Sequence, residues 1–236
     1  ARLRETIDVE LPFRSLFEAP TVAELALQVE AARRSEQGPK APPLRPIDRS
    51  TPPRASFSQE RMWLQQQIYP EGSGFNMPGA VRIRGPFAAE LFAQSLRDVV
   101  NRHESLRTRF EEVDNRPVQV IAEESRLEVP LIDLTELPLH DRETEMRRRF
   151  DEASSRPFDL SQDELLRCFV MKISEDEHVF FLNMHHIISD GWSTNILIQE
   201  TLTLYRGLVE EQPATLPALA IQFAAVCEWQ RQWRRG

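Results

Sequence analysis

The segment Met-His-His-Ile-Ile-Ser-Asp-Gly-Trp-Ser occupies residues 184–193 and follows an apolar run at residues 179–184. An apolar run of this length predicts a buried strand, and apolar side chains at helical spacing follow Ser193. The segment therefore predicts a strand that ends in a polar loop and leads into a helix. Side chains of adjacent strand residues point to opposite faces, so only one of His185 and His186 can face a given cavity.

The polar residues of this segment suit proton transfer. Histidine titrates near neutrality, Asp190 can orient a neighbour or form a buried ion pair, and Gly191 lets backbone approach a ligand closely. A purely structural, hydrogen-bonded His185–His186 pair remains an open alternative. A metal site built from the two histidines and Asp190 is disfavoured because adjacent strand histidines diverge and no usual zinc spacing is present. No metal site is therefore predicted.

Helical and strand-like patterns alternate around this segment. The spacing predicts helices over 59–67, around Phe92–Val100, over 143–153 and over 193–208. It also predicts a last helix that carries Leu219, Phe223, Val226 and Cys227. Strands are predicted over 80–85, 118–121, 168–173 and 179–184. The last two strands are split by a polar tetrapeptide at 174–177, which predicts a hairpin. Trp63 and Trp192 are predicted core anchors, Cys168 a buried thiol, and His140 and His178 exposed.

The chain changes character near its beginning. Thr21 and Glu24 form a capping-box pattern that opens an apolar stripe of Val22, Leu25, Ala26 and Val29. Six of the 17 prolines then fall within residues 35–53, which favours a semi-stiff linker. The predicted organisation is a helical segment at 1–34, the linker at 35–53, and a larger domain at 54–236.

Composition limits the classes of function. The chain has 236 residues, 29 basic and 37 acidic, with a net charge of −8, which argues against nucleic-acid binding. No apolar run is long enough to span a membrane, and the first residues carry no signal-peptide pattern. Cys168 and Cys227 are too few for a disulfide scaffold, so a cytoplasmic location is expected. Because the first residue is not Met, the chain is expected to begin inside a longer protein.

Four ordered motifs carry a family resemblance. His-His-x-x-x-Asp-Gly at 185–191 resembles the central motif of condensation domains from nonribosomal peptide synthetases. Residues 56–64, Ser-Phe-Ser-Gln-Glu-Arg-Met-Trp-Leu, resemble the first motif, S-x-A-Q-x-R-L-W-F, and residues 102–110, Arg-His-Glu-Ser-Leu-Arg-Thr-Arg-Phe, closely match the second, R-H-E-x-L-R-T-x-F. Residues 221–230 are a looser match to the fourth, in which Gln222 stands where the family has an acidic residue.

The resemblance implies a fold and a domain order. It implies an α/β (α+β) lobe similar to chloramphenicol acetyltransferase, with a mixed sheet flanked by helices. In the family, two such lobes enclose a substrate tunnel, and residues 54–236 are expected to be the first. Residues 1–34 resemble the C-terminal helices of a peptidyl carrier domain. The serine that would hold its phosphopantetheine arm is expected upstream of Ala1, so no cofactor is expected to be attached to this chain.

The resemblance also implies an activity, in which an acceptor amine attacks a carrier-bound donor thioester. The parent synthetase is therefore expected to be an amide-bond-forming acyltransferase. It gives His186 the central position, as general base, orienter of the amine or stabiliser of the tetrahedral intermediate. The Gly191 N–H is a candidate donor to a reacting group, and Asp190 is expected to hold the loop by an ion pair. His185 is expected to belong to the catalytic group with His186, Asp190 and Gly191, whereas Trp192 and Ser193 are expected to support the structure or line the tunnel. Arg102 and Arg107 are either partners or tunnel-wall residues, or else ordinary surface arginines on a helix end.

The implied partners are an upstream donor carrier, a downstream acceptor carrier, the second lobe and the adenylation domain of the same synthetase. Residues 74–79 and 189–193 favour an L-configured donor. Two alternatives remain open, an epimerization domain that shares the central motif and a non-catalytic docking or structural module. A single lobe would lack half its tunnel, so the chain alone is predicted to be inactive.

Overall fold

The structure is a computed structural model that describes residues 9, 11, 14–35 and 43–233. The chain divides into two compact units, Ala1–Pro43 and Leu44–Gly236. The division falls inside the proline-rich stretch that the sequence predicts as a linker, part of which lies outside the described residues.

The first unit contains two helices, α2 (Ser15–Glu18) and α3 (Val22–Ser35). The predicted capping box is present at the start of α3, because the Thr21 N–H donates to Glu24 Oε2 at 3.1 Å and the Glu24 N–H donates to Thr21 Oγ1 at 3.3 Å. The predicted apolar stripe is only partly buried, since Val29 is buried whereas Val22 is 88% exposed.

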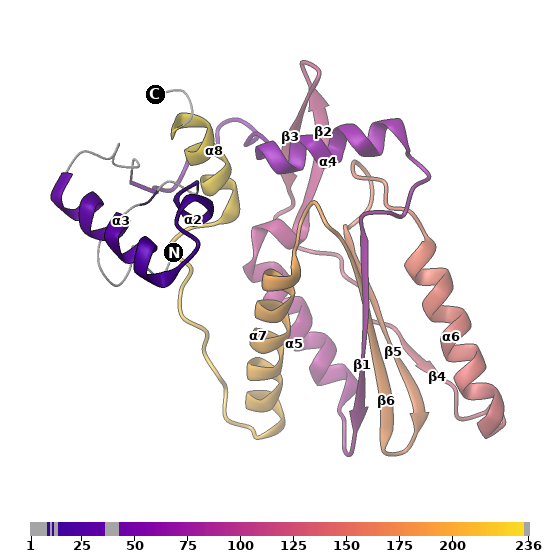
Figure 1. Cartoon of the computed structure of the whole chain (residues 1–236). Coiled ribbons are helices and arrows are strands. Elements are labelled where there is room, and N and C mark those ends of the chain that lie inside the picture. Colours follow the sequence, from indigo (N-terminus) through magenta and orange to yellow (C-terminus); the bar gives the residue numbers. More distant parts are fainter. Residues whose placement is uncertain (1–8, 10, 12–13, 36–42, 234–236) are drawn as a thin grey trace. The chain divides into compact units, whose positions relative to one another are not determined.

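The second unit is built on a mixed four-stranded sheet in the order β1-β6-β5-β4, in which only β4 and β5 run parallel (Figure 1). A separate antiparallel hairpin pairs β2 with β3. The elements are α4 (Phe57–Ile68), β1 (Asn76–Arg84), α5 (Ala89–Arg102), a 3-10 helix (Glu104–Arg107), β2 (Thr108–Val113), β3 (Arg116–Ile121), β4 (Leu131–Asp133), α6 (Leu139–Ser155), β5 (Leu166–Ser174), β6 (Glu177–His185), α7 (Gly191–Val209) and α8 (Phe223–Trp233).

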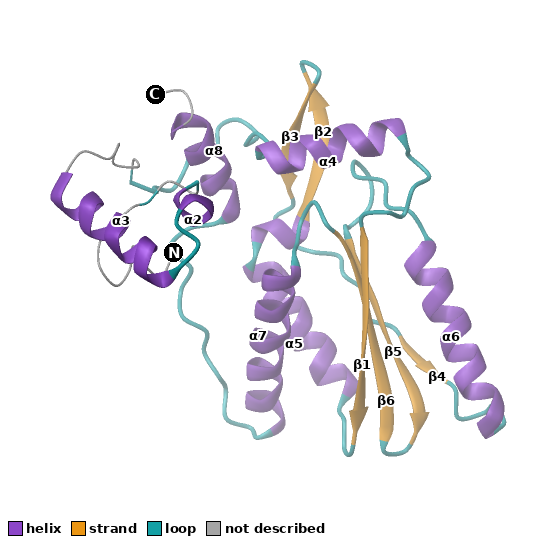
Figure 2. Ribbon diagram, viewed as in Figure 1, coloured by secondary structure: helices purple, strands orange, loops and turns teal. Residues whose placement is uncertain are grey.

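Helices cover both faces of the sheet, as Figure 2 shows, with α5 and α7 on one side and α6 on the other. Alternate residues of β5 and β6 face each side, so Val170 and Leu182 pack with α5 while Met171 and Val179 lie in a second cluster beside Met146 of α6. Burial on both faces explains why these two strands are apolar over most of their length. No helix in the described part of the chain is long and apolar enough to cross a membrane.

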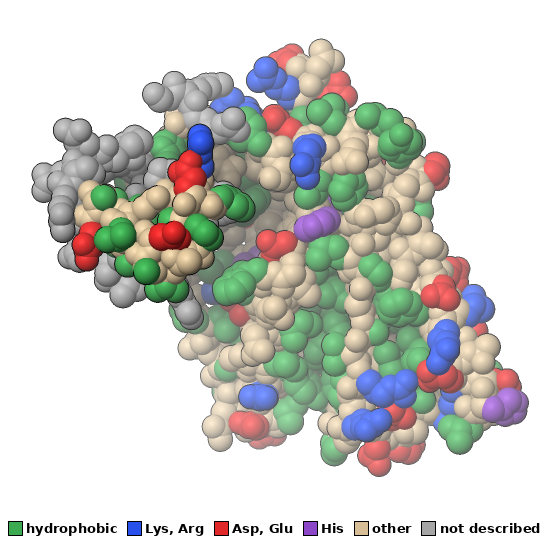
Figure 3. Space-filling model, in the orientation of Figure 1, with side chains coloured by type: hydrophobic (Ala, Val, Ile, Leu, Met, Phe, Trp, Pro, Cys, Tyr) green, Lys and Arg blue, Asp and Glu red, His purple; other side chains and the backbone are tan. Residues whose placement is uncertain are grey.

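The surface divides by residue type. Figure 3 shows mixed charge over α6 and hydrophobic side chains gathered around β1 and α7. Helix α6 has no buried residue, and Arg148 pairs with both Glu145 and Glu152 along it. The charged residues of this helix therefore form a solvated face.

Most predicted elements exist, with longer bounds than the sequence indicates. The hairpin of β5 and β6 is confirmed, while β2 and the three-residue β4 are additional strands. The last helix begins at Phe223, so Leu219 lies outside it. Trp63 and Cys168 are buried, as predicted.

The predicted burial of Trp192 and the predicted exposure of His178 are both wrong. Trp192 is 79% exposed because it lies in the first turn of α7, on the side of the helix opposite to the buried Leu197. His178 is 5% exposed rather than solvated, because Phe87 covers it with the ring centroids 5.1 Å apart. In both cases the burial of the side chain depends on which distant segments pack against it. Local patterns of charged and apolar residues do not contain this information.

Candidate active site

The loop between β6 and α7 is held by backbone hydrogen bonds where it leaves the strand. The His185 N–H donates to Leu165 O at 2.9 Å, and the His186 N–H donates to Phe75 O at 2.8 Å. A turn follows, in which the Ile188 N–H donates to His185 O at 3.1 Å. These bonds fix the peptide planes that carry both histidines.

His186 is exposed to solvent and has one ring nitrogen engaged. Its Nδ1 lies 2.7 Å from Ser189 O. A carbonyl oxygen only accepts hydrogen bonds, so Nδ1 carries the proton in this contact. In the neutral ring, Nε2 therefore keeps its lone pair and is available as a proton acceptor.

His185 is buried, with 1% of its surface exposed. Its Nδ1 accepts the Ile187 N–H at 3.1 Å, and the rings of Phe75 and Phe158 lie 5.6 and 6.1 Å away. Burial lowers the pKa of His185 to about 4, and the charge of protonated His186 acts in the same direction. The predicted divergence of the two side chains is confirmed, with His185 in the interior and His186 at the surface.

Asp190 caps α7. Its Oδ1 accepts the Ser193 N–H at 2.8 Å, and its own N–H donates to Ser193 Oγ at 2.7 Å, which makes a reciprocal capping box. The hydrogen bonds from the Ser193 N–H and hydroxyl hold the pKa of the Asp190 carboxyl below its usual range. Among the described contacts Asp190 has no ion pair and holds the loop as a helix cap.

Gly191 is the first residue of α7 and is exposed. The first N–H groups of a helix have no intrahelical acceptor, so the helix start presents donors close to His186 in the chain. A Cβ built on Gly191 would meet nothing within 4 Å. Lack of space within the chain therefore does not explain this glycine, and close approach of a ligand stays a prediction. Trp192, next in sequence, adds an exposed indole at the same helix start.

The contacts of Arg102 and Arg107 lie outside this loop. Arg102 Nε donates to Glu200 Oε2 at 3.2 Å, and its Nη2 donates to Pro217 O. Arg107 donates to Asn101 O at 3.1 Å and to Ala122 O. Both arginines tie the end of α5 to neighbouring segments, and among the described contacts neither reaches the central motif.

The unusual residue of the fourth motif has a clear structural role. Gln222 Oε1 accepts the Glu104 N–H at 3.2 Å, and its Nε2 donates to Arg102 O at 3.0 Å. An amide serves both contacts because it is donor and acceptor at once, which a carboxylate is not. Gln222 therefore joins the fourth motif to the second.

One supporting residue is not evident from the sequence analysis. Gln59, buried at 4% exposure, donates from Nε2 to Ile187 O at 3.0 Å and accepts the Ser56 N–H at 2.9 Å. The first motif thus holds the central loop across 128 positions of sequence. The position of Gln59 in the first motif could have indicated this role, because a polar side chain on a buried helix face requires a hydrogen-bond partner.

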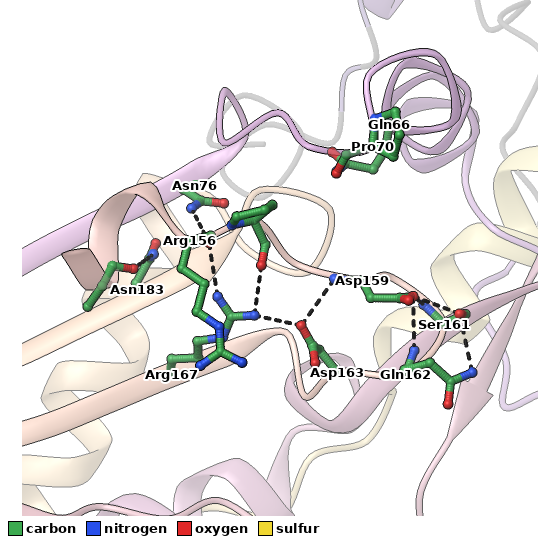
Figure 4. A network of polar contacts seen from close by, with 12 residues as sticks. Gln66, Pro70, Asn76, Arg156, Asp159, Ser161, Gln162, Asp163, Arg167 and Asn183 are labelled. Atoms are coloured by element: carbon green, nitrogen blue, oxygen red, sulfur yellow. Dashed lines mark hydrogen bonds and ion pairs between the residues drawn. The ribbon is translucent and has the colours of Figure 1, made fainter. Parts of the chain in front are cut away.

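A cavity of about 530 Å³ is lined by Phe158 and Arg167 among others, and no residue of 185–193 lines it. Figure 4 shows its polar network, in which Arg167 donates to Arg156 O and Pro157 O and pairs with Asp163. The Arg167 guanidinium carbon lies 3.9 Å from the centre of the Phe158 ring. Among the described residues no cluster of three His, Cys, Asp or Glu side chains could hold a metal ion.

Comparison with known proteins gives relatives over the whole chain. A subunit of linear gramicidin synthase from Brevibacillus parabrevis is 39% identical over 236 residues, which are 100% of this chain and 4% of that protein. Bacitracin synthase 3 of Bacillus licheniformis is 37% identical over 231 residues, 98% of this chain and 3% of that protein. The chain thus spans a few per cent of the length of these relatives.

Solved structures share the fold. The starter condensation domain of rhizomide synthetase matches with a TM-score of 0.72 and 24% identity, over 79% of this chain and 45% of that one. The X-domain from teicoplanin biosynthesis matches with a TM-score of 0.73 and 28% identity, over 83% of this chain and 41% of that one. The family model for the condensation domain matches residues 53–236. The chain therefore belongs to the condensation domain family of nonribosomal peptide synthetases.

Proposed function

We propose that this chain carries the histidine-bearing lobe of a peptide-bond-forming site, in which an acceptor α-amine attacks a donor thioester. The observation that carries the proposal is the His186 ring, fixed by Nδ1 to Ser189 O with Nε2 free at the surface. Similarity to the synthases of linear gramicidin and bacitracin supports the same class of reaction.

The chemistry required of His186 is modest. An α-amine has a pKa near 8 and is largely protonated at neutral pH, whereas a thioester is already an activated acyl donor. Nε2 accepts a hydrogen bond from the free amine, orients its lone pair toward the thioester carbon, and takes the proton as the C–N bond forms. The thiolate of the donor arm is the leaving group and takes up a proton as thiol.

The other residues act on position and charge. Asp190 and Ser193 hold the start of α7, so that the Gly191 N–H faces the region where the tetrahedral oxyanion develops. His185 and Gln59 hold the turn from behind, through Ile187 N and Ile187 O respectively. Trp192 supplies an exposed apolar wall beside the reacting groups.

The proposal includes partners and carriers. Donor and acceptor ride on phosphopantetheine arms of two carrier domains, a second lobe closes the tunnel over His186, and an adenylation domain loads the acceptor carrier. Residues 1–34 are proposed to be the end of the upstream carrier, which is supported by identity with a linear gramicidin synthase over all 236 residues.

The test is a single-turnover reaction of the synthetase containing this chain, with both carriers loaded and the products identified by intact-protein mass and chiral analysis. The expected product is a condensed peptide on the acceptor carrier. A change of stereochemistry without a new amide bond would assign the chain to epimerization, and unchanged substrates with both carriers bound would make it a docking module.

A further inference from the structure

One end of the sheet face beneath α6 is polar. Asn76 lies opposite His185 in the pairing of β1 with β6, and Arg167 lies opposite Asn183 in the pairing of β5 with β6. Side chains opposite each other in antiparallel strands share a face. The next pair on that face is Phe169 and Phe181, stacked with centroids 4.6 Å apart, so the polar group is confined to the end of the sheet that carries the central motif.

The last turn of α6 closes over this polar end. Asn183 Nδ2 donates to Ala153 O at 3.0 Å, and Asn76 Nδ2 donates to Ser154 O at 2.7 Å. Figure 4 shows Asn76, Asn183 and Arg167 together at this end of the sheet. The two asparagines therefore hold neighbouring carbonyls of this turn, and Ser154 is bonded to Asn76, the residue opposite His185.

Three buried atoms in this layer have no hydrogen-bond partner within the described part of the chain: Asn183 Oδ1, His185 Nε2 and Ser154 Oγ. Asn183 and His185 are 0% and 1% exposed. Because His185 Nδ1 accepts the Ile187 N–H, the neutral ring carries its proton on Nε2. The layer therefore holds an unpaired donor, an unpaired acceptor and a hydroxyl that can be either.

The hydrogen-bonding character of these three atoms determines which kind of ligand they can bind. The Nε2–H donor disfavours a cation, and the amide oxygen disfavours an anion. Water accepts from Nε2–H while it donates to Asn183 Oδ1 and Ser154 Oγ, which are three hydrogen bonds, the number that buried waters typically make. Buried polar groups in folded proteins almost always have such a partner.

We propose that Asn183, Ser154 and His185 bind an internal water behind the central motif, and that Asn183 is thereby a positioning residue for the loop that carries His186. The water holds the Nε2–H tautomer of His185, so that Nδ1 stays free to accept the Ile187 N–H. That bond fixes the turn from His185 to Ser189, whose carbonyl orients His186. Arg167, which lies opposite Asn183 in the sheet, also lines the cavity with Arg156 and Phe158.

The binding site itself is tested without any activity, by ¹⁵N-histidine NMR and a high-resolution crystal structure of the chain. The nitrogen shifts of His185 report which ring nitrogen carries the proton, and a cross-peak from Nε2–H to water reports the bound molecule. We expect the Nε2–H tautomer at pH 7, the water cross-peak, and density for a water between His185 Nε2 and Asn183 Oδ1.

Variants separate this role from simple packing. Asn183→Leu keeps the volume but removes both the acceptor and the Nδ2 donor to Ala153 O, and should abolish the water cross-peak. Asn183→Asp keeps the acceptor and should retain the water, while its carboxylate raises the pKa of His185 by about one pH unit. Thr201→Val is the matched control, because Thr201 Oγ1 is another buried hydroxyl without a partner among the described residues but lies on α7. It should change neither signal.

The Nδ1–H tautomer in the wild type, a dry layer in the crystal, or an unchanged water signal in Asn183→Leu would each overturn the proposal. If Asn183→Leu does not fold, Ser154→Ala and Asn183→Asp give the same comparison. The positioning role of Asn183 rests on the proposed function and is tested by enzyme kinetics, separately from the test of water binding. Asn183→Leu should lower kcat about tenfold with KM unchanged, and Asn183→Asp should restore it. A lost water with full kcat would overturn the positioning role alone.

Discussion

Two neighbouring histidines have opposite surroundings in this loop. His185 is enclosed by Phe75 and Phe158 and stays neutral, whereas His186 stands at the surface with Nε2 free. The strand alternation that separates them is a backbone property, so it is readable from sequence. The groups that hold the two rings are Ile187 N and Ser189 O. They depend on the turn after β6 and therefore cannot be read from the sequence.

The burial of His185 predicts a pH dependence of stability. Its pKa is about 4 in the folded chain and about 6.5 when the ring is solvated. Between these values the unfolded chain binds a proton that the folded chain does not, so the free energy of unfolding falls as pH falls, by about 1.4 kcal/mol per pH unit. The loss reaches about 3 kcal/mol by pH 4.

Urea unfolding measured between pH 7 and pH 4.5 checks this expectation, with His185→Gln as the comparison. The variant lacks the titrating ring, so its stability should fall less steeply with decreasing pH. Burial also lowers the pKa of His178, which contributes in the same direction and remains in both proteins. Parallel pH profiles for wild type and variant would contradict the assignment to His185.

At the scale of the element, the start of α7 depends on its cap. Asp190→Ala removes the acceptor for the Ser193 N–H and should cost about 1 kcal/mol of unfolding free energy. Asp190→Asn keeps an acceptor and should cost only a few tenths of a kcal/mol. Thermal or urea unfolding distinguishes these outcomes. Equal, large losses in both variants would show that the charge, and hence an ion pair, matters more than the cap.

The other end of α7 contains a glycine that the packing requires. A Cβ on Gly207 would lie 2.6 Å from Ala214 N and 2.8 Å from Gln212 O, both backbone atoms. Alanine in a helix normally stabilises by about 1 kcal/mol relative to glycine, but here Gly207→Ala should destabilise by about 1–3 kcal/mol.

Gly79→Ala is the matched control for this prediction. Gly79 lies in β1, and a Cβ there would meet nothing within 4 Å, so its change in unfolding free energy should stay within about 0.5 kcal/mol. A stabilised Gly207→Ala variant in chemical unfolding would contradict the packing of the segment after α7.

Helices and central strands could be predicted because their periodic apolar pattern matches a buried face, as in α5 with Phe92, Leu96 and Val99. The short β4 could not, since three residues show no period. At the site, the contacts of Asp190 and Arg102 could not be predicted, for one reason. Each side chain has several possible partners in the sequence. Only the fold brings Ser193 within hydrogen-bond distance of Asp190 and Glu200 within hydrogen-bond distance of Arg102.

At the scale of the whole molecule, the central loop lies at one end of a sheet covered on both faces, and His186 faces solvent. The match covers only 41–45% of the chains of the solved relatives, so each of them contains a further part of comparable size. Catalysis of this kind depends on excluding water and fixing both reactants. The chain alone should therefore give no peptide above the uncatalysed rate, as measured by mass spectrometry with both loaded carriers. Peptide formed by the chain alone would contradict the need for a second lobe.

The most direct test of the account is the single-turnover rate of amide formation in the synthetase that contains the chain, measured for wild type, His186→Ala and His140→Ala. His140 is the control because its side chain is 81% exposed on α6, far along the sequence from the loop. The account predicts at least about a hundredfold loss for His186→Ala, the scale of acid–base and positioning catalysis, and no loss for His140→Ala. A rate for His186→Ala close to that of wild type would contradict it.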